Sequence, residues 1–180
     1  MTIRPIIFSA EMVRALLEGR KTQTRRLATS YLRKCEAGDL LWGRESWRPR
    51  RGFSNWDAQV HYQVDDAVKH FEEDDIDSEW NWPKAAEKGF VPSIHMPRWA
   101  SRLTLRVTDV RFQGVKDIDG IDALAEGITP VPGRAPWRVF RTLWDSLHTK
   151  PGERFFDNPQ IVALTFEVIH GNVDEIARAE

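Results

Sequence analysis

The chain has 180 residues, of which 41% are apolar and 29% are charged. This length fits one domain of ordinary size, and the composition excludes collagen-like, low-complexity and wholly disordered proteins. No stretch has the roughly 18 consecutive apolar residues of a membrane helix, and the first residues lack the apolar segment of a signal peptide. The single cysteine, Cys35, excludes an intrachain disulfide. We therefore expect a protein of the reducing cytoplasm that makes no contact with a membrane.

Positive charge is concentrated in the first third of the chain. Residues 1–51 hold 12 Lys and Arg against 5 Asp and Glu, whereas residues 52–180 hold 14 against 22. Such an excess attracts a phosphate-bearing ligand without making the whole chain a general polyanion binder. The chain also has eight tryptophans, which either fill a core or stack on a planar ligand. We assign Trp137 and Trp144 to the core because they lie seven residues apart on one predicted helix.

The N-terminal residues predict a strand followed by a helix. The strand covers residues 3–8, and Pro5 favours an edge position or a strand start. Ser9 is a good N-cap for a helix at 10–18, whose apolar residues recur at helical spacing and whose end is followed by a glycine. The next segment, 20–26, has no apolar period. We expect it to form a loop that is exposed on at least one side.

The rest of the chain predicts strands with two further helices. The predicted strands are 40–47, 58–64, 103–112 and 161–169, and the predicted helices are 119–126 and 136–147. We expect a loop at 48–57, a mobile, solvated acidic insertion at about 65–89 and a flexible tail at 171–180. Strands and helices without regular alternation predict an α+β fold. The hypothesis is a single domain over residues 1–170, with a small barrel-like mixed sheet and two or three flanking helices.

Several kinds of site are excluded by missing motifs. The five histidines have no His-x-x-x-His spacing and the sequence has no Cys-x-x-Cys, so neither a zinc site nor a zinc-dependent base deaminase is expected. There is no Gly-x-Gly-x-x-Gly or Walker sequence, which removes the usual nucleotide-cofactor folds. We therefore expect neither a metal nor an organic cofactor.

The segment 19–26, Gly-Arg-Lys-Thr-Gln-Thr-Arg-Arg, combines one amine, two hydroxyls and three guanidinium groups. A threonine hydroxyl becomes a nucleophile once a base removes its proton. Lys21 acts as such a base if burial and neighbouring cations lower its pKa from about 10.4 toward neutrality. With Thr22 or Thr24 it would form a hydroxyl–lysine variant of the catalytic triad. The alternative is a cationic surface loop that binds phosphate or no ligand at all.

Gly19, Lys21 and Arg25 or Arg26 resemble the signature of the ASCH domains, in which a Gly-x-Lys segment and then an arginine follow the first helix. The similarity extends to the segments 39–47, 92–105, 122–127 and 160–169. It therefore covers nearly the whole chain outside the acidic insertion and the tail, and it is strongest to the longer ASCH proteins often carried by phages and prophages. The resemblance implies the PUA-like barrel fold.

The ASCH resemblance also implies two kinds of function. ASCH domains were proposed to bind RNA, and some are reported as ribonucleases. Small bacterial members are amidohydrolases that remove the acetyl group from N4-acetylcytidine with a Lys, a Thr and a Glu. Lys21 and Thr24 match the first two positions, and Glu126 matches the third, although Glu45 competes for that role. By this resemblance, neutral Lys21 takes the Thr24 proton, Thr24 Oγ attacks the amide carbonyl, and Glu126 orients Lys21.

Further residues are candidates for binding the substrate. Trp47 or Trp99 would stack on the pyrimidine, and Glu45 and His95 would recognise its edge. For His95 and Arg98 the alternative is a structural turn around a proline. The complete set of candidate substrate-binding residues is Arg20, Arg25, Arg26, Glu45, Trp47, His95, Arg98 and Trp99.

Two hypotheses from different classes follow. The first is an amidohydrolase that acts on N4-acetylcytidine or related N4-acylated cytosine nucleosides. The second is a non-catalytic module that binds RNA or a modified base through residues 20–51. A metal-dependent nuclease is the least favoured, because the sequence places no acidic cluster beside the basic segment. The expected partner is thus a modified nucleoside or RNA, and no obligatory protein partner is inferred.

Overall fold

The computed structural model describes residues 1–51, 57–77 and 80–179. The chain divides into two compact units, which are described separately. The first unit comprises residues 1–2, 15–39 and 106–168, and the second comprises residues 3–14, 40–105 and 169–180. No helix in these described ranges is long and apolar enough to cross a membrane.

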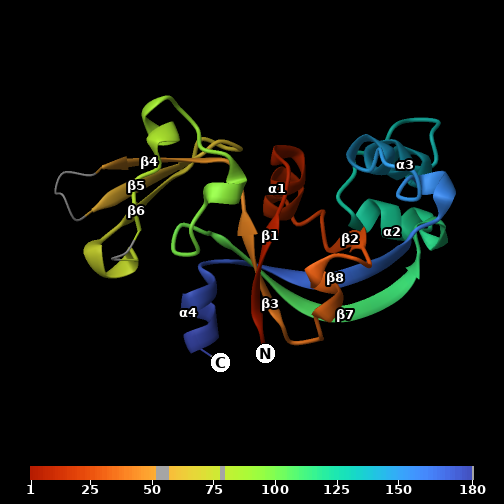
Figure 1. The fold of residues 1–180 in the computed structure, drawn as a ribbon, viewed down its shortest axis with the longest axis horizontal. Coiled ribbons are helices and arrows are strands. Elements are labelled where there is room, and N and C mark those ends of the chain that lie inside the picture. Colours follow the sequence, from red (N-terminus) through yellow and green to blue (C-terminus); the bar gives the residue numbers. More distant parts are fainter. Residues whose placement is uncertain (52–56, 78–79, 180) are drawn as a thin grey trace. The chain divides into compact units, whose positions relative to one another are not determined.

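The fold is a mixed α+β fold with four α-helices and two sheets among the described residues (Figure 1). The helices are α1 (Ala10–Leu17), α2 (Gly120–Ala125), α3 (Pro136–Leu147) and α4 (Val173–Arg178). The strands are β1 (Ile3–Ile7), β2 (Gln23–Leu27), β3 (Leu40–Arg44), β4 (Trp47–Arg51), β5 (Ala58–Tyr62), β6 (Val68–Phe71), β7 (Leu103–Gly114) and β8 (Gln160–His170). The strand orders are β1-β3-β7-β8-β2 and β4-β5-β6, and in the described part of the chain neither sheet closes into a barrel.

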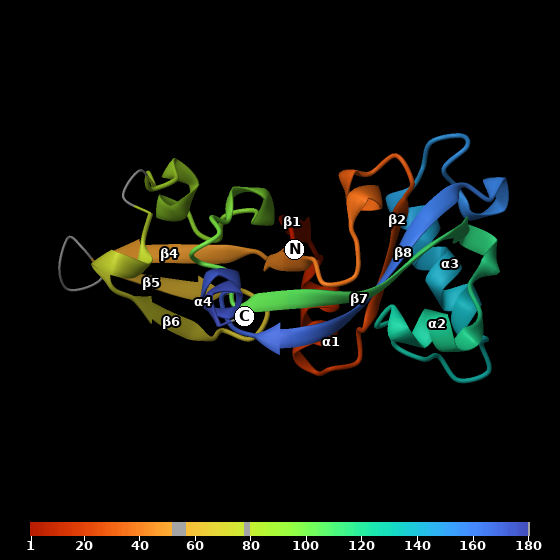
Figure 2. The same ribbon diagram turned by 90° about the horizontal axis from the view of Figure 1, so that it is seen from below.

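In the first unit, α2 and α3 pack beside β8 (Figure 2). β2 pairs antiparallel with β8 from Gln23↔Thr165 to Leu27↔Ile161. α3 has the predicted bounds, with Pro136 in its first turn, where a missing N–H costs nothing. Its apolar stripe is buried against α2 and β8. The core of this unit includes Val115, Ile118, Ala123, Phe140, Trp144, Ile161 and Ala163.

Segment 20–26 differs from the prediction of an exposed loop, because most of it belongs to β2. Lys21, Thr24 and Arg25 are only 1%, 0% and 2% exposed. The prediction was wrong because polar side chains give no apolar period. Burial is nevertheless possible here, since the backbone of β2 pairs with β8 and carboxylates from the α2 region compensate the buried cations.

In the second unit, β1 pairs parallel with β3, and β4, β5 and β6 form an antiparallel three-stranded sheet (Figure 1). β1 is an edge strand, as the proline at its centre predicts. α1 begins as predicted, because Ser9 Oγ accepts a hydrogen bond from the Met12 N–H at 3.4 Å. One face of the three-stranded sheet covers a core of Trp47, Ala58, Val60, Tyr62, Phe71, Val91, Met96, Trp99 and Ala100.

Two predicted irregular segments of this unit contain regular structure instead. Residues 48–51, placed in a loop by the sequence, continue β4, because buried Trp47 and Pro49 alternate with more exposed arginines; residues 52–56 of that predicted loop lie outside the described residues. The acidic insertion includes β6, which pairs with β5. Trp80 and Trp82 from the same insertion pack against the core, so this part of it is not the solvated segment that the sequence predicted. Residues 78–79 of the predicted insertion lie outside the described residues.

The predicted flexible tail contains α4. Asn172 caps this helix, because its Oδ1 accepts from the Asp174 N–H at 2.9 Å. Its Nδ2 also donates to three backbone carbonyls within residues 98–101. Val173 is fully buried in a small cluster with Leu40 and Trp42. The cap and the buried valine together stabilise a helix that the short apolar pattern did not predict.

Candidate functional site

Lys21 is buried in the first unit and is held by three oxygen atoms. Its Nζ donates to the backbone carbonyl of Gln23 at 2.8 Å, to the backbone carbonyl of Glu126 at 2.7 Å and to Glu126 Oε2 at 3.1 Å. An ammonium group has three hydrogens, so these three acceptors satisfy all of them. The structure thus brings Lys21 and Glu126 together, as the resemblance predicted.

The backbone places Lys21 beside the end of α2. Its N–H donates to the Ala15 carbonyl at 3.0 Å, and Lys21 forms an antiparallel bridge with Glu126. Gly127 follows directly with a φ of +84°, and a Cβ there would lie 2.8 Å from Lys21 Cβ and 2.9 Å from Ala15 Cβ. Only glycine therefore fits both the turn and the close approach.

A second buried cation, Arg25, shares the same carboxylate. Its Nη1 donates to Glu126 Oε1 at 3.0 Å and to Gln23 Oε1 at 2.9 Å, while its Nη2 forms an ion pair with Asp122. We call Lys21, Arg25, Asp122 and Glu126 the Lys21 cluster. In it, one buried carboxylate lies between two cations, and the second carboxylate, Asp122, lies nearer the surface.

The environment lowers the pKa of Lys21 from its ordinary value. Burial lowers the pKa of Lys21 more than the Glu126 carboxylate raises it, and the charges of Arg26 and Arg25 lower it further. Burial alone would raise the pKa of Asp122, but Arg25 and Arg111 hold it below its ordinary value. The Lys21 cluster therefore combines an amine shifted toward neutrality with a carboxylate held ionised.

Thr24, the predicted nucleophile, is fully buried in β2. Its Oγ1 accepts a hydrogen bond from Arg26 Nη1 at 2.8 Å. A cationic donor at this oxygen stabilises the alkoxide over the neutral hydroxyl. Transfer of the Thr24 proton to Lys21 stays a prediction.

Arg20, a predicted substrate-binding residue, binds groups of the protein in this structure. Its Nε donates to Glu18 Oε2 at 2.7 Å, and its Nη1 donates to the Gly127 carbonyl at 3.0 Å. The second of these bonds ties Arg20 to the glycine that packs on Lys21. Arg20 thereby supports the turn that carries Glu126.

The competing carboxylate, Glu45, lies in the second unit and has a different partner. Arg102 binds it through two parallel hydrogen bonds, Nε to Oε1 at 2.8 Å and Nη2 to Oε2 at 2.9 Å, and also pairs with Asp65 at 2.9 Å. The Arg102 guanidinium lies 4.0 Å from the centroid of the Tyr62 ring. We call Glu45, Tyr62, Asp65 and Arg102 the Arg102 cluster. Arg102 and Asp65 were not predicted as site residues, because no local sequence pattern links residues so far apart.

Protonation in the Arg102 cluster is set by burial and by one cation. Burial raises the pKa of Glu45 despite the bound Arg102, and it raises the pKa of Tyr62 well above its ordinary value. Burial acts in the same direction on Asp65, but Arg102 and the Ala67 N–H outweigh it and lower its pKa. The two carboxylates of this cluster therefore differ, and Glu45 takes up a proton first as the pH falls.

The two tryptophans expected to stack on a pyrimidine belong to an aromatic core. Trp47 is completely buried, with its ring centroid 5.8 Å from that of Trp80 and 6.1 Å from that of Trp99. A fully enclosed ring has no free face for a base, so the role predicted for Trp47 is corrected to core packing. Trp99 is 8% exposed and lines a small cavity of about 130 Å³.

His95 and Arg98 lie in and after a short turn at Ser93–His95 of the second unit. His95 is exposed. Arg98 forms an ion pair with Asp174, and its carbonyl accepts from Asn172 Nδ2 at 2.9 Å. These bonds of Arg98 fit the alternative given in the sequence analysis, a structural turn around a proline.

Metal-ligating groups are not clustered in the described part of the chain. No three His, Cys, Asp or Glu residues there are arranged to hold a metal ion. Cys35 is buried and forms no disulfide.

No family model matches the sequence, and no curated protein matches it. Solved structures do resemble the fold. One is protein EF3133 from Enterococcus faecalis V583, described with the family model DUF984, at 12% identity and a TM-score of 0.48 over 98% of this chain and 81% of that one. Another is the hypothetical protein PH0355, at 13% identity and a TM-score of 0.41 over 94% of this chain and 100% of that one.

Proposed function

We propose that the protein is an amidohydrolase of the ASCH family that removes the acyl group from N4-acetylcytidine or related N4-acylated cytosine nucleosides. The observation that carries this proposal is the buried contact between Lys21 Nζ and Glu126 Oε2, close in the chain to the buried hydroxyl of Thr24. The proposal includes the PUA-like architecture that accompanies this family.

The first chemical step is proton transfer from Thr24 to Lys21. Neutral Lys21 has a free electron pair and accepts the hydroxyl proton, while the Arg26 N–H stabilises the oxygen left behind. Thr24 Oγ then forms a bond to the carbonyl carbon of the exocyclic amide. The lowered pKa of Lys21 supports this step, because it populates the neutral base at lower pH than for an exposed lysine.

The second step releases the nucleoside and then the acid. The bond between the acyl carbon and N4 breaks, N4 takes the proton held by Lys21, and cytidine leaves an acyl ester on Thr24. Water hydrolyses this ester with the same groups acting in reverse. Glu126 keeps Lys21 oriented throughout by its direct hydrogen bond. Because Thr24 is fully buried, the acyl group of the substrate has to enter the interior beside the Lys21 cluster to reach Thr24 Oγ.

The experiment is turnover of N4-acetylcytidine, followed by chromatography of released cytidine. We expect Thr24→Ala to lose at least about 10³-fold in kcat/KM, since it removes the nucleophile. Thr22→Ala is the matched control, because Thr22 is exposed in the same segment, and it should stay within about twofold. Full activity of Thr24→Ala would overturn the mechanism, and no turnover by the unaltered protein would overturn the function.

A second candidate function, a module that binds RNA, is supported by the exposed face of the β4–β5 pair. Arg48 lies opposite His61, and Arg50 lies opposite Gln59. Arg50 is exposed on this face and Arg48 is partly exposed. Phosphate oxygens accept hydrogen bonds from exposed guanidinium groups.

This candidate predicts salt-dependent binding of single-stranded RNA. The association constant should fall by about 0.7 log unit per log unit of salt for each phosphate contacted. Arg48→Gln with Arg50→Gln should reduce that slope, measured by fluorescence anisotropy. No binding at low salt would refute the module and leave the amidohydrolase proposal intact.

A further inference from the structure

The first unit has a hollow of about 350 Å³ on its surface, lined mainly by apolar side chains. This volume falls in the range of about 300–1,000 Å³ that is typical of small-molecule sites. The lining residues are Lys116, Ile118, Trp137, Arg141, Phe155 and Phe156. We call this hollow the Phe156 pocket; it shares no lining residue with the Lys21 cluster.

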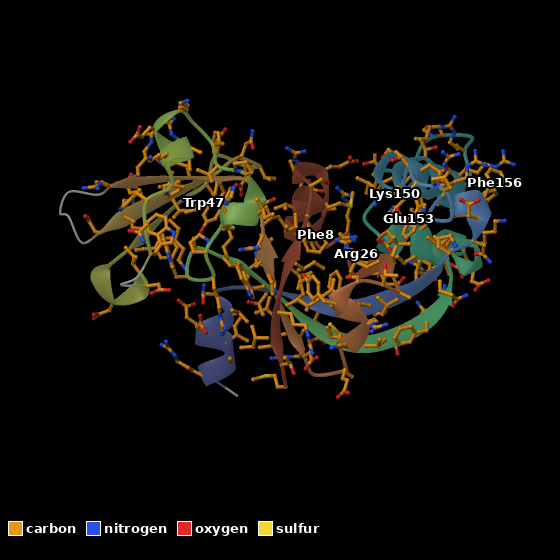
Figure 3. The ribbon with its side chains drawn as sticks, viewed as in Figure 1. Phe8, Arg26, Trp47, Lys150, Glu153 and Phe156 are labelled. Atoms are coloured by element: carbon orange, nitrogen blue, oxygen red, sulfur yellow. The ribbon has the colours of Figure 1, made fainter. Side chains whose placement is uncertain are left out.

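Three of the six residues that line the Phe156 pocket are aromatic. Trp137 and Phe155 are stacked, with centroids 6.4 Å apart and an angle of 18° between their planes. Phe156 is 69% exposed and projects at the outer edge of its unit (Figure 3). A ligand with its own flat ring would gain stacked or edge-to-face contacts here and would cover an apolar ring that water now surrounds.

Positive charge surrounds these rings. Lys116 Nζ and Arg141 Cζ lie 5.5 Å and 5.4 Å from the centroid of the same Phe156 ring, and Arg138 Cζ lies 5.3 Å from that of Trp137. Within the described residues, none of these three cations forms an ion pair with a carboxylate. An anion that binds beside the Phe156 ring would be attracted by both Lys116 and Arg141.

Carboxylates in the adjoining chain segments accept hydrogen bonds from backbone N–H groups. Asp117 Oδ2 accepts from Gly114 at 2.9 Å, and Asp157 Oδ2 accepts from Gly152 at 2.9 Å. Asp145 Oδ1 accepts from the Phe155 N–H at 2.7 Å.

The start of α3 adds to the positive field. Trp137 lies in the first turn of this helix, and the residue before the helix, Ala135, has no side chain that can cap it. The partial positive charge of the helix N-terminus therefore stays uncompensated beside the aromatic wall.

We propose that the Phe156 pocket binds a small aromatic anion. The aromatic ring of the ligand packs on Trp137 and Phe156, and its acidic group lies between Lys116 and Arg141. This site does not depend on the proposed amidohydrolase activity, because its lining residues have no part in the hydrolytic steps.

The experiment is isothermal titration calorimetry with 2-naphthoate and with its neutral counterpart, 2-naphthamide. We expect saturable 1:1 binding of 2-naphthoate and at least tenfold weaker binding of 2-naphthamide. Arg141→Gln and Lys116→Gln should each weaken 2-naphthoate at least fivefold, and Phe156→Ala should weaken both compounds. These side chains lie at the surface, so the thermal unfolding midpoint should not change.

Arg134→Gln is the matched control, because Arg134 is an exposed cation of the same unit that does not line the pocket. It should leave the affinity for 2-naphthoate within twofold. The proposal is overturned if 2-naphthoate shows no saturable binding, if 2-naphthamide binds equally well, or if Arg134→Gln weakens binding as much as Arg141→Gln.

Discussion

The Lys21 and Arg102 clusters both bury charged groups, but the group that is shared is a carboxylate in the first and a guanidinium in the second. In the Lys21 cluster, two buried cations share the Glu126 carboxylate. In the Arg102 cluster, one cation lies between two carboxylates, Glu45 and Asp65. Burial is the largest influence in both clusters: it lowers the pKa of Lys21 and raises the pKa of Glu45, in each case against the charge of the bound partner.

The largest expected effect is the loss of the shared carboxylate. Glu126→Ala leaves Lys21 and Arg25 buried without their common partner, which should lower the free energy of unfolding by about 3–5 kcal/mol. Urea unfolding measures this change. Glu36→Ala, at an exposed position of the same unit, should stay within about 0.5 kcal/mol. Equal effects of the two substitutions would remove the distinction between the cluster and the surface.

A smaller loss is expected when the central cation of the other cluster is removed. Arg102→Ala should cost about 2–3 kcal/mol at pH 7, because Glu45 is left buried and ionised. The loss of unfolding free energy should be smaller at pH 5, since Glu45 can take up a proton. The Arg25 guanidinium, which loses one of its two carboxylate partners in Glu126→Ala, cannot give up its charge in this way. Urea unfolding of both variants at the two pH values makes the comparison. If Arg102→Ala loses the same unfolding free energy at both pH values, an ionised Glu45 is not the cause of the loss.

The sequence predicted local features of the two units better than it predicted these clusters. The bounds of α3 follow from a proline at its first position and an apolar stripe, both of which are local signals. The Arg25–Asp122 and Arg102–Glu45 pairs join residues 97 and 57 positions apart, and no spacing rule connects them. The meeting of Lys21 and Glu126 was predicted only through the family resemblance. Segment 20–26 was misjudged because its burial depends on those distant partners.

The smallest expected effect is a difference between the two clusters in how the free energy of unfolding changes at alkaline pH. Burial raises the pKa of Tyr62 above its ordinary 10.0, so its contribution to stability is complete below pH 10 and is lost as the pH rises further. The lowered pKa of Lys21 acts in the opposite direction, because the unfolded chain binds more protons up to its ordinary value of 10.5.

Tyr62→Phe should isolate the Tyr62 contribution. The substitution removes the hydrogen bond to the Ala100 carbonyl, at 2.9 Å, and should cost about 1 kcal/mol at pH 7. Above pH 10 its stability should fall less steeply than that of the unaltered protein, by up to about 1.4 kcal/mol per pH unit. Urea unfolding at several alkaline pH values gives the slope of unfolding free energy against pH for both proteins. Identical slopes would show that Tyr62 does not cause the alkaline loss of stability.

The central claim concerns the charge of one buried amine. It is tested most directly by following the ¹³Cε shift of Lys21 against pH by NMR, with the signal assigned from its loss in Lys21→Arg. Exposed Lys150 serves as the internal reference. We expect the titration midpoint of Lys21 to lie clearly below that of Lys150. A Lys21 midpoint equal to or above that of Lys150 would show that burial does not lower the pKa of this amine.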